Sequence, residues 1–211
     1  MVSRRRFSTV IVKAKLVMNP LIFPQERLLH QLGVDGEVDL LYAMSYDQSG
    51  PNHSSRELAK QTIKQARNAD LDTAKLCVGV PFYGRDNRGG IDNDSRVWVF
   101  LKSCSHVPGD WITYEDIVQK NSLTGKEDEV PKDGALVGFN GRRTIAWKTK
   151  LAFNEGVGGV MIWEVGQDCR VHPVTRGDTV HVSTCPRAED SSLLAAITEA
   201  VKKLRISKQE L

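Results

Sequence analysis

The chain has 211 residues, of which 40% are apolar and 26% charged, and its formal net charge is +3. This balance predicts a folded domain with a sizeable core and excludes an intrinsically disordered chain. No apolar run approaches the roughly 20 residues that cross a bilayer, and the basic residues form no stripe of the kind that binds nucleic acid. We therefore expect no membrane span and no nucleic-acid partner. The basic start at residues 4–6 precedes too short an apolar stretch for a signal peptide.

Apolar runs of strand length alternate with helical patterns, which is typical of βα units around a parallel sheet. The expected strands are residues 9–16, 38–46, 75–82 and 159–163. The expected helices are residues 25–31, a helix that begins near residue 54, residues 144–154 and residues 191–204. Ser54 and Glu57 form a capping-box pattern at the second helix, and Gly156 is expected to end the third. Four such units are half of an eight-stranded barrel, which needs about 250 residues.

A long segment, about residues 86–143, separates the third strand from its helix. It is too long for a plain connection between a strand and a helix. We therefore expect a small α+β insertion that stands over the carboxyl end of the sheet and forms one wall of a cleft. Two of its tryptophans, Trp98 and Trp111, suit the core of the insertion and the stacking of a sugar equally well.

Polar and aromatic residues lie at the carboxyl ends of three of the expected strands. The second strand ends in YAMSYD (42–47), the third continues into VGVPFYGR (78–85), and the fourth ends in GGVMIWE (158–164). Catalytic groups of (β/α)₈ barrels sit at the carboxyl ends of the strands, so the three tips are expected to share one cleft. The alternative for Tyr46 and Asp47 is a pair that ends a strand without any catalytic role.

Together these motifs resemble the second half of a glycoside hydrolase family 18 domain, the family of chitinases and chitinase-like lectins. The sequence GFN at 138–140, followed by Thr144 and Lys148, resembles the approach to the seventh helix of that family. The resemblance covers about residues 12–204. It implies an α/β fold that is the second half, about strands 5–8, of a (β/α)₈ TIM barrel, with an α+β insertion after the seventh strand. Residues 1–211 would then be one partial family 18 domain.

The resemblance also implies a substrate and a chemistry. The substrates would be polymers or oligomers of N-acetylglucosamine, chiefly chitin, and no cofactor or metal is implied. In this retaining mechanism the acetamido oxygen of the substrate attacks the anomeric carbon while a glutamic acid protonates the leaving oxygen. Tyr46 would donate a hydrogen bond to the acetamido carbonyl, and Asp47 would hold a sugar hydroxyl or the distorted ring.

Four more residues are carried over as substrate-binding residues. Met44 would pack under the acetamido methyl, Trp163 would form an apolar floor, and Tyr83 and Arg85 would bind sugars on the leaving-group side. Taken without the resemblance, Trp163 would more often be a core residue than a platform for a ligand. Arg85 is likewise compatible with an ion pair to a carboxylate of the insertion.

The proton donor of the family lies in an aspartate-x-x-aspartate-x-aspartate-x-glutamate signature, which occurs nowhere in the 211 residues. Acidic clusters at 92–94 and 127–129 lack a preceding apolar strand. Glu164 would point away from Trp163, so we favour a structural hydrogen bond or ion pair for it. The simplest interpretation is that the first half lies outside this chain, which alone would be inactive. The alternative is a lectin-like or non-functional fragment that binds amino sugars without cleaving them.

Cys169 and Cys185 bracket a loop that contains His172 and His181, which is compatible with a disulfide or with a metal site. Mixed Cys/His sites usually show tighter ligand spacing, so we expect no metal.

The last four residues, KQEL (208–211), differ at one position from an endoplasmic reticulum retention signal and suggest a parent protein in the secretory pathway. A half-barrel would leave strand edges near Val10 and Val160 unpaired. We therefore expect the isolated chain to aggregate or to self-associate.

Overall fold

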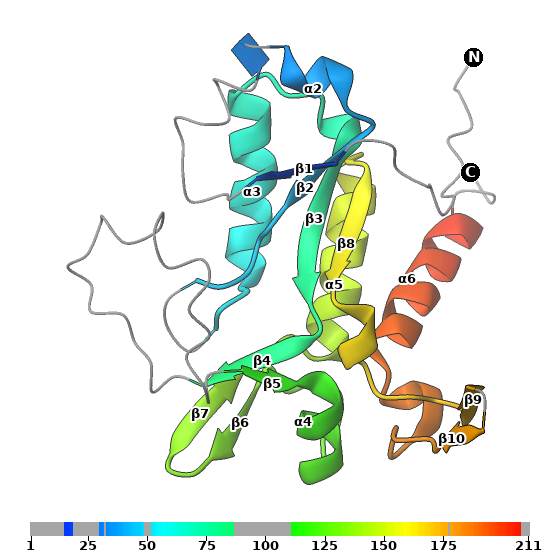
Figure 1. Ribbon diagram of the computed structural model, residues 1–211. Helices are drawn as coiled ribbons and strands as arrows, with labels where there is room; N and C mark the ends of the chain where they lie inside the picture. The colour runs from blue at the N-terminus through cyan, green and yellow to red at the C-terminus, as the bar shows by residue number, and fades with distance from the viewer. Residues whose placement is uncertain are drawn as a thin grey trace.

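A four-stranded parallel sheet is the centre of the fold in the computed structural model, which describes residues 15–18, 30–31, 33–48, 52–86, 111–176 and 178–207. Its strands lie side by side in chain order: β1 (Lys15–Met18), β2 (Leu40–Ala43), β3 (Leu76–Pro81) and β8 (Gly159–Trp163). Helices α3 (Arg56–Asn68) and α5 (Arg142–Asn154) pack against this sheet, and α6 (Leu193–Ser207) packs against α5 (Figure 1). The predicted α/β class is confirmed.

The sheet and its helices bury one continuous apolar face. Leu41, Leu76 and Val78 are fully buried together with Ala59 and Ile63 of α3. The spacing of the two α3 residues, four apart, places them on the same side of the helix. Each such burial stabilises the fold by about 1.5–3 kcal/mol per large side chain. No helix in the described ranges has the length and apolar character needed to cross a bilayer.

The observed boundaries follow the predicted ones closely where the two can be compared. The fourth strand has the predicted bounds, while β2 and β3 are shorter than expected. Gly156 follows the end of α5 with a φ of 68°, the left-handed conformation expected after a helix. Most of the predicted first unit, residues 9–14 and 19–29, lies outside the described residues. A short helix, α2 (Val34–Glu37), precedes β2 and was not expected.

The capping-box prediction at the second helix is wrong by one residue. Ser55, not Ser54, is the N-cap of α3, and its Oγ accepts a hydrogen bond from the Leu58 N–H at 3.0 Å. Ser54 is fully buried, and its hydroxyl donates to the Ser45 carbonyl at 2.7 Å. Ser54 therefore has a tertiary partner that the local pattern could not reveal.

A second, antiparallel sheet occupies the segment where an insertion was expected. Its order is β5 (Trp111–Thr113), β4 (Tyr83–Asp86), β7 (Ala135–Gly138) and β6 (Glu129–Lys132), and α4 (Tyr114–Lys120) follows β5. Figure 1 shows this sheet below the carboxyl end of β3. The sheet begins at Tyr83, a few residues earlier than predicted, so two residues of the candidate site are part of it. Trp98 lies outside the described residues.

One residue, Phe82, joins the two sheets. Its N–H donates to the carbonyl of Trp163 in β8 at 2.8 Å, and its own carbonyl accepts from the Tyr114 N–H at 3.1 Å. Its ring is fully buried in the same cluster as Val137 and Phe139. Both backbone groups and the side chain of Phe82 are therefore fixed, and they fix the sheets to each other.

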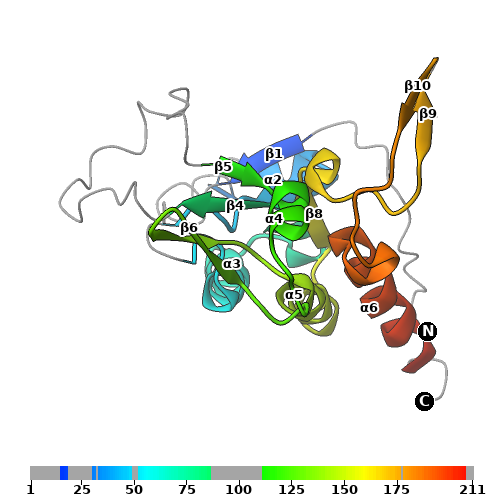
Figure 2. The same ribbon diagram turned by 90° about the horizontal axis from the view of Figure 1, so that it is seen from below.

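The remaining described elements lie after β8. A hairpin of β9 (Val174–Arg176) and β10 (Thr179–His181) projects from the body of the molecule (Figure 2). Cys169 and Cys185 form a disulfide at its base, which confirms the first of the two alternatives. Within the described ranges, no three His, Cys, Asp or Glu side chains are grouped to hold a metal. The single-turn 3₁₀ helices are Thr73–Lys75, Val165–Gln167 and Ala188–Asp190.

Replacing both Cys169 and Cys185 by alanine is expected to lower the free energy of unfolding by about 3 kcal/mol. The disulfide spans a sequence separation of 16 residues, and closing a loop of this size removes entropy from the unfolded chain. Urea unfolding of the wild type and the variant, each with and without a reducing agent, measures the difference. The reducing agent should destabilise only the wild type, and equal stabilities under oxidising conditions would contradict the argument.

Candidate functional site

Three predicted site residues meet at one carboxylate oxygen. Asp47 lies in the loop after β2, and Tyr83 and Arg85 lie on β4. The Tyr83 hydroxyl donates to Asp47 Oδ1 at 2.6 Å, and Arg85 Nη1 lies 3.0 Å from the same oxygen. Arg85 thus has Asp47 as an ion-pair partner. The Asp47 side chain is 44% exposed, so it remains accessible to a ligand.

This arrangement keeps Asp47 ionised. Burial alone would raise the pKa of Asp47, but the contacts from His53, Tyr83 and Arg85, together with the positive charge of Arg85, lower that pKa to about 2. A carboxylate of this kind cannot act as a proton donor at neutral pH. It can accept hydrogen bonds and stabilise a nearby positive charge.

Tyr46, by contrast, keeps its proton. Its side chain is only 7% exposed, and its ring meets the ring of Tyr83 edge-on, with the centroids 6.1 Å apart. Burial raises the pKa of Tyr46 well above its usual range, and the negative charge of Asp47 acts in the same direction. The phenol is therefore a hydrogen-bond donor beside a fixed negative charge.

Trp163 lies on the same face of the sheet as Tyr46. A Cβ added at Gly79 would lie 2.8 Å from the Tyr46 ring, so this side of β3 faces Tyr46. Gly79 of β3 pairs with Met161 of β8, and paired residues of neighbouring strands point to the same side of the sheet. Trp163, two residues after Met161, points to that side as well. Trp163 is 50% exposed, which is not the exposure of a core residue.

Met44 directly follows β2 and is half-buried at the same edge of the sheet. The structure thus brings the tips of β2, β3 and β8 to one edge. Trp111, for which the sequence left two roles open, belongs to the neighbouring wall: it is 42% exposed and meets the Tyr83 ring edge-on at 5.2 Å.

The other carboxylates that the sequence raised have structural partners. Glu164 accepts a hydrogen bond from Gln167 Nε2 at 3.2 Å, in agreement with the structural role expected for it. Glu127 accepts from the backbone N–H groups of Thr124 and Gly125, each at 2.9 Å. Asp128 accepts from the Gly141 N–H at 2.8 Å, just before α5. The cluster at 92–94 lies outside the described residues.

Behind Tyr46 lies a buried polar network that sequence reasoning missed. Lys148 of α5 is fully buried, and its Nζ donates to Ser54 O at 2.8 Å, Ser54 Oγ at 2.7 Å and Asn140 Oδ1 at 2.7 Å. Ser54 in turn donates to the carbonyl of Ser45, whose own hydroxyl donates to Gly79 O at 3.0 Å. The network therefore reaches the residue between Met44 and Tyr46.

His53 is the second missed residue. Its side chain is 1% exposed and lies between the Asp47 loop and Tyr83. The sequence offered little signal for it, because a histidine in a loop rich in Ser and Asn is normally solvated. Lys148 belongs to the family-like motif after GFN, and it also lies on the face of α5 that carries Thr144, Ile145 and Ala152, but neither signal assigned it a contact.

Replacing Asp47 by asparagine is expected to lower the free energy of unfolding by about 1 kcal/mol at pH 6 and by much less at pH 2.5. The pKa of Asp47 is about 2 in the folded chain and about 3.9 in an unfolded one. Its ion pair therefore stabilises the fold above pH 4, and this stabilisation is lost as the pH falls towards 2. The figure is reduced for solvent screening of a partly exposed pair. Urea unfolding at both pH values measures the difference, and the exposed Asp39→Asn change, the control, should leave it near zero.

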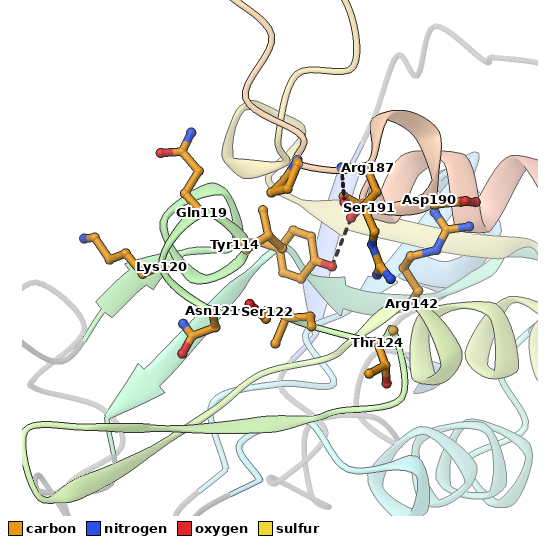
Figure 3. A pocket seen from close by; sticks show the side chains of 14 residues that line it. Tyr114, Gln119, Lys120, Asn121, Ser122, Thr124, Arg142, Arg187, Asp190 and Ser191 are labelled. Atoms are coloured by element: carbon orange, nitrogen blue, oxygen red, sulfur yellow. Dashed lines mark hydrogen bonds between the residues drawn. The ribbon is translucent and has the colours of Figure 1, made fainter.

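A cavity of about 450 Å³ lies apart from these residues, beside α4 (Figure 3). Residues 121–125 and 186–191 form much of its wall. The Tyr114 hydroxyl donates to Ser191 O at 3.0 Å there, and the Arg142 side chain is engaged by Glu199 and by backbone carbonyls. None of the predicted site residues lines this cavity.

Comparison with known proteins agrees with this geometry. The model of the family described as "Glycosyl hydrolases family 18" matches residues 29–168, more than half of the chain. Among curated proteins no sequence matches the chain.

Solved chitinases have similar structures. The GH18 chitinase ChiB of Flavobacterium johnsoniae is 27% identical, with a TM-score of 0.52, and the match covers 79% of this chain and 43% of that one. A chitinase of Bacteroides thetaiotaomicron is 22% identical (TM-score 0.54; 79% and 46% covered). Catalytic domain 2 of the Group II chitinase of Ostrinia furnacalis is 16% identical (TM-score 0.58; 90% and 55% covered). The chain spans about half the length of these proteins. From the family match over residues 29–168, the chain belongs to the glycosyl hydrolases of family 18.

Proposed function

We propose that this chain is the second half, strands 5–8, of a chitinase-type domain that hydrolyses β-1,4 bonds between N-acetylglucosamine units. The family match, the four parallel strands in chain order and the coverage of about half of each solved chitinase support this proposal. The observation that carries it is the cluster of Asp47, Tyr83 and Arg85 beside the protonated Tyr46, at the sheet edge that also bears Trp163.

In the proposed mechanism Tyr46 donates its hydrogen to the acetamido carbonyl of the substrate and orients that oxygen for attack on the anomeric carbon. The intermediate carries positive charge, and the fixed carboxylate of Asp47 stabilises it. Met44 packs under the acetamido methyl, and the indole of Trp163 supports the apolar face of the sugar ring. Tyr83 gives its one hydroxyl hydrogen to Asp47, so its oxygen accepts a hydrogen bond from a hydroxyl of the neighbouring sugar, and the Arg85 guanidinium donates to that sugar.

The proton donor is the part that these residues do not supply. Asp47 is ionised, and Glu164 already accepts a hydrogen bond from Gln167. We assign the general acid to a glutamic acid of the first barrel half, outside these 211 residues. The absence of the acidic signature also favours a second candidate, a domain that binds N-acetylglucosamine oligomers without cleaving them.

Two further proposals concern the setting of the chain. β8 has β3 as its one paired neighbour, and β1 has β2, among the strands that the structure describes. We propose that these edges self-associate unless the first half covers them. The Cys169–Cys185 disulfide supports a parent protein of the secretory pathway.

The test compares the chain with a version extended by the in-frame sequence upstream, each incubated with a fluorogenic N-acetylglucosamine oligomer. Turnover is expected only in the extended version, because loss of a general acid costs about 10² to 10⁴ in rate. Tyr46→Phe in that version should abolish most turnover, whereas Tyr114→Phe, which removes a buried hydroxyl elsewhere, should not.

Turnover by the 211-residue chain alone would overturn the assignment of the acid, with Glu164 as the first residue to test. Binding of the oligomer without turnover in either version would favour the second candidate. An absence of both binding and turnover would contradict both candidates.

A further inference from the structure

The geometry points to His53 as a positioning residue of the candidate site: a neutral imidazole, protonated at Nε2, that holds the Asp47 loop and the Tyr83 strand at a fixed separation. The relevance of this role to sugar binding rests on the proposed function. His53 itself lies outside the motifs by which the sequence indicated the site.

Two hydrogen bonds connect the His53 ring to backbone atoms of the site. The Asp47 N–H donates to His53 Nδ1 at 3.4 Å, and His53 Nε2 lies 3.3 Å from the carbonyl oxygen of Tyr83. The Asp47 side chain is itself bound by Tyr83, at 2.6 Å. The imidazole thus bridges the main chains of two residues whose side chains also meet.

A single tautomer satisfies both contacts. Nδ1 must carry a lone pair to accept from the Asp47 N–H, and Nε2 must carry a hydrogen because a carbonyl can only accept. Asp47 Oδ1 lies 3.5 Å from Nδ1, about as far as the Asp47 nitrogen, and it is the acceptor that a hydrogen on Nδ1 would have. A charged imidazolium would instead donate from Nδ1 and leave the Asp47 N–H without its acceptor.

The surroundings favour the neutral ring. Burial lowers the pKa of His53 and outweighs the opposing effects of nearby Asp47 and of the Tyr83 carbonyl, while the charge of Lys148 adds to the lowering. The ring also lies against Tyr83, with the centroids 5.0 Å apart and the planes inclined by 36°.

The same residue also closes the loop through its main chain. The carbonyl of His53 accepts from the Gln48 N–H at 2.9 Å. Asp47 adopts a φ of 65°, which a residue with a Cβ rarely adopts without local support. His53 supplies that support by binding the N–H groups of two successive residues, one through the ring and one through the backbone.

The first test is the protonation of the ring in the 211-residue chain, measured by ¹⁵N NMR at pH 7. His53→Asn identifies the His53 signals by their loss. We expect an unprotonated Nδ1 and a protonated Nε2. A protonated Nδ1 would overturn the inference, whatever the chain binds.

The second test measures binding of N-acetylglucosamine tetramer by calorimetry. His53→Leu removes both ring contacts and should weaken binding about tenfold or more, whereas His53→Asn retains an acceptor for the Asp47 N–H and should recover most of the affinity. His172→Leu, an exposed histidine of the later loop, is the matched control. Equal weakening by Leu and Asn would overturn the positioning role.

If the 211-residue chain binds no tetramer without the first half, the carboxyl signal of Asp47 decides the inference instead. Its pKa should rise in His53→Leu but stay low in His53→Asn, because the displaced loop no longer aligns Asp47 with Tyr83 and Arg85. An unchanged pKa in the leucine variant would overturn the inference.

Discussion

Replacing Lys148 by methionine is expected to lower the free energy of unfolding by about 2–3 kcal/mol at pH 9 and by clearly less at pH 6. Methionine fills a similar volume but donates no hydrogen bond. The substitution removes the donor that now binds two buried acceptors, Asn140 Oδ1 and Ser54 O. Each buried acceptor that loses its hydrogen bond costs about 1–3 kcal/mol. The variant no longer has to bury an amine away from water, and the absence of this cost offsets part of the loss of stability.

The pH dependence follows from the charge of the same group. Burial lowers the pKa of Lys148 to about 7, Asp128 opposes this shift, and Arg56 adds to it. An unfolded chain binds that proton up to about pH 10.4. Between these values the unfolded state holds more protons, so the stability of the wild type rises with pH, by up to about 1.4 kcal/mol per unit. The methionine variant lacks this gain, and the gap between the two proteins therefore widens as the pH rises.

Chemical unfolding of both proteins at pH 6 and pH 9 measures this gap. Lys150→Met is the matched control, because Lys150 lies on the same helix but is exposed. It should change the stability by less than about 0.5 kcal/mol at either pH. A gap between wild type and Lys148→Met that does not vary with pH would show that Lys148 stays charged throughout.

Replacing Gly79 by alanine should both destabilise the fold and displace Tyr46. The added Cβ would lie 2.4 Å from the Ala43 carbonyl oxygen, 2.8 Å from Tyr46 Cε1 and 3.1 Å from the Ser45 nitrogen. Two of these atoms belong to the backbone and cannot rotate away. The tip of β2 must therefore move, at a cost of about 1–3 kcal/mol.

Thermal unfolding measures the first effect of Gly79→Ala, and the change in Tyr46 ring signals measures the second. Gly166→Ala is the control, because a Cβ at Gly166 would meet nothing within 4 Å. If Gly79→Ala matched its control in both measurements, the close contact between β3 and the Tyr46 ring would not exist in solution.

Sequence patterns predicted the elements best where local signals agreed. β8 has its predicted bounds because two glycines, Gly158 and Gly159, precede an uninterrupted apolar run. The end of α5 was predictable from Gly156, since only glycine adopts a left-handed conformation there at little cost. The capping box failed although the local pattern favours Ser54, which has Glu57 three residues later, because the Ser54 hydroxyl has a buried tertiary partner.

The site was predictable as a set of strand tips but not as a set of contacts. Asp47 and Tyr83 are 36 residues apart, and each was expected to face a ligand, yet they bind each other. Neither the burial of His53 nor that of Lys148 was predicted, because the burial of a polar residue depends on elements that are distant in the sequence. Buried positions of this kind can be identified only from the tertiary structure, because histidine and lysine side chains are usually expected to be solvent-exposed.

The way Phe82 ties the two sheets together has a consequence for modularity. Its backbone binds Trp163 on one side and Tyr114 on the other, and the next residue, Tyr83, already belongs to the antiparallel sheet. Tyr83 and Arg85 would therefore be lost with the insertion if it were deleted. The antiparallel sheet therefore cannot be replaced as a unit without loss of two residues of the candidate site. A chimera that keeps this site must place its junctions between Asp86 and Trp111, because both β5 and β7 pair with β4.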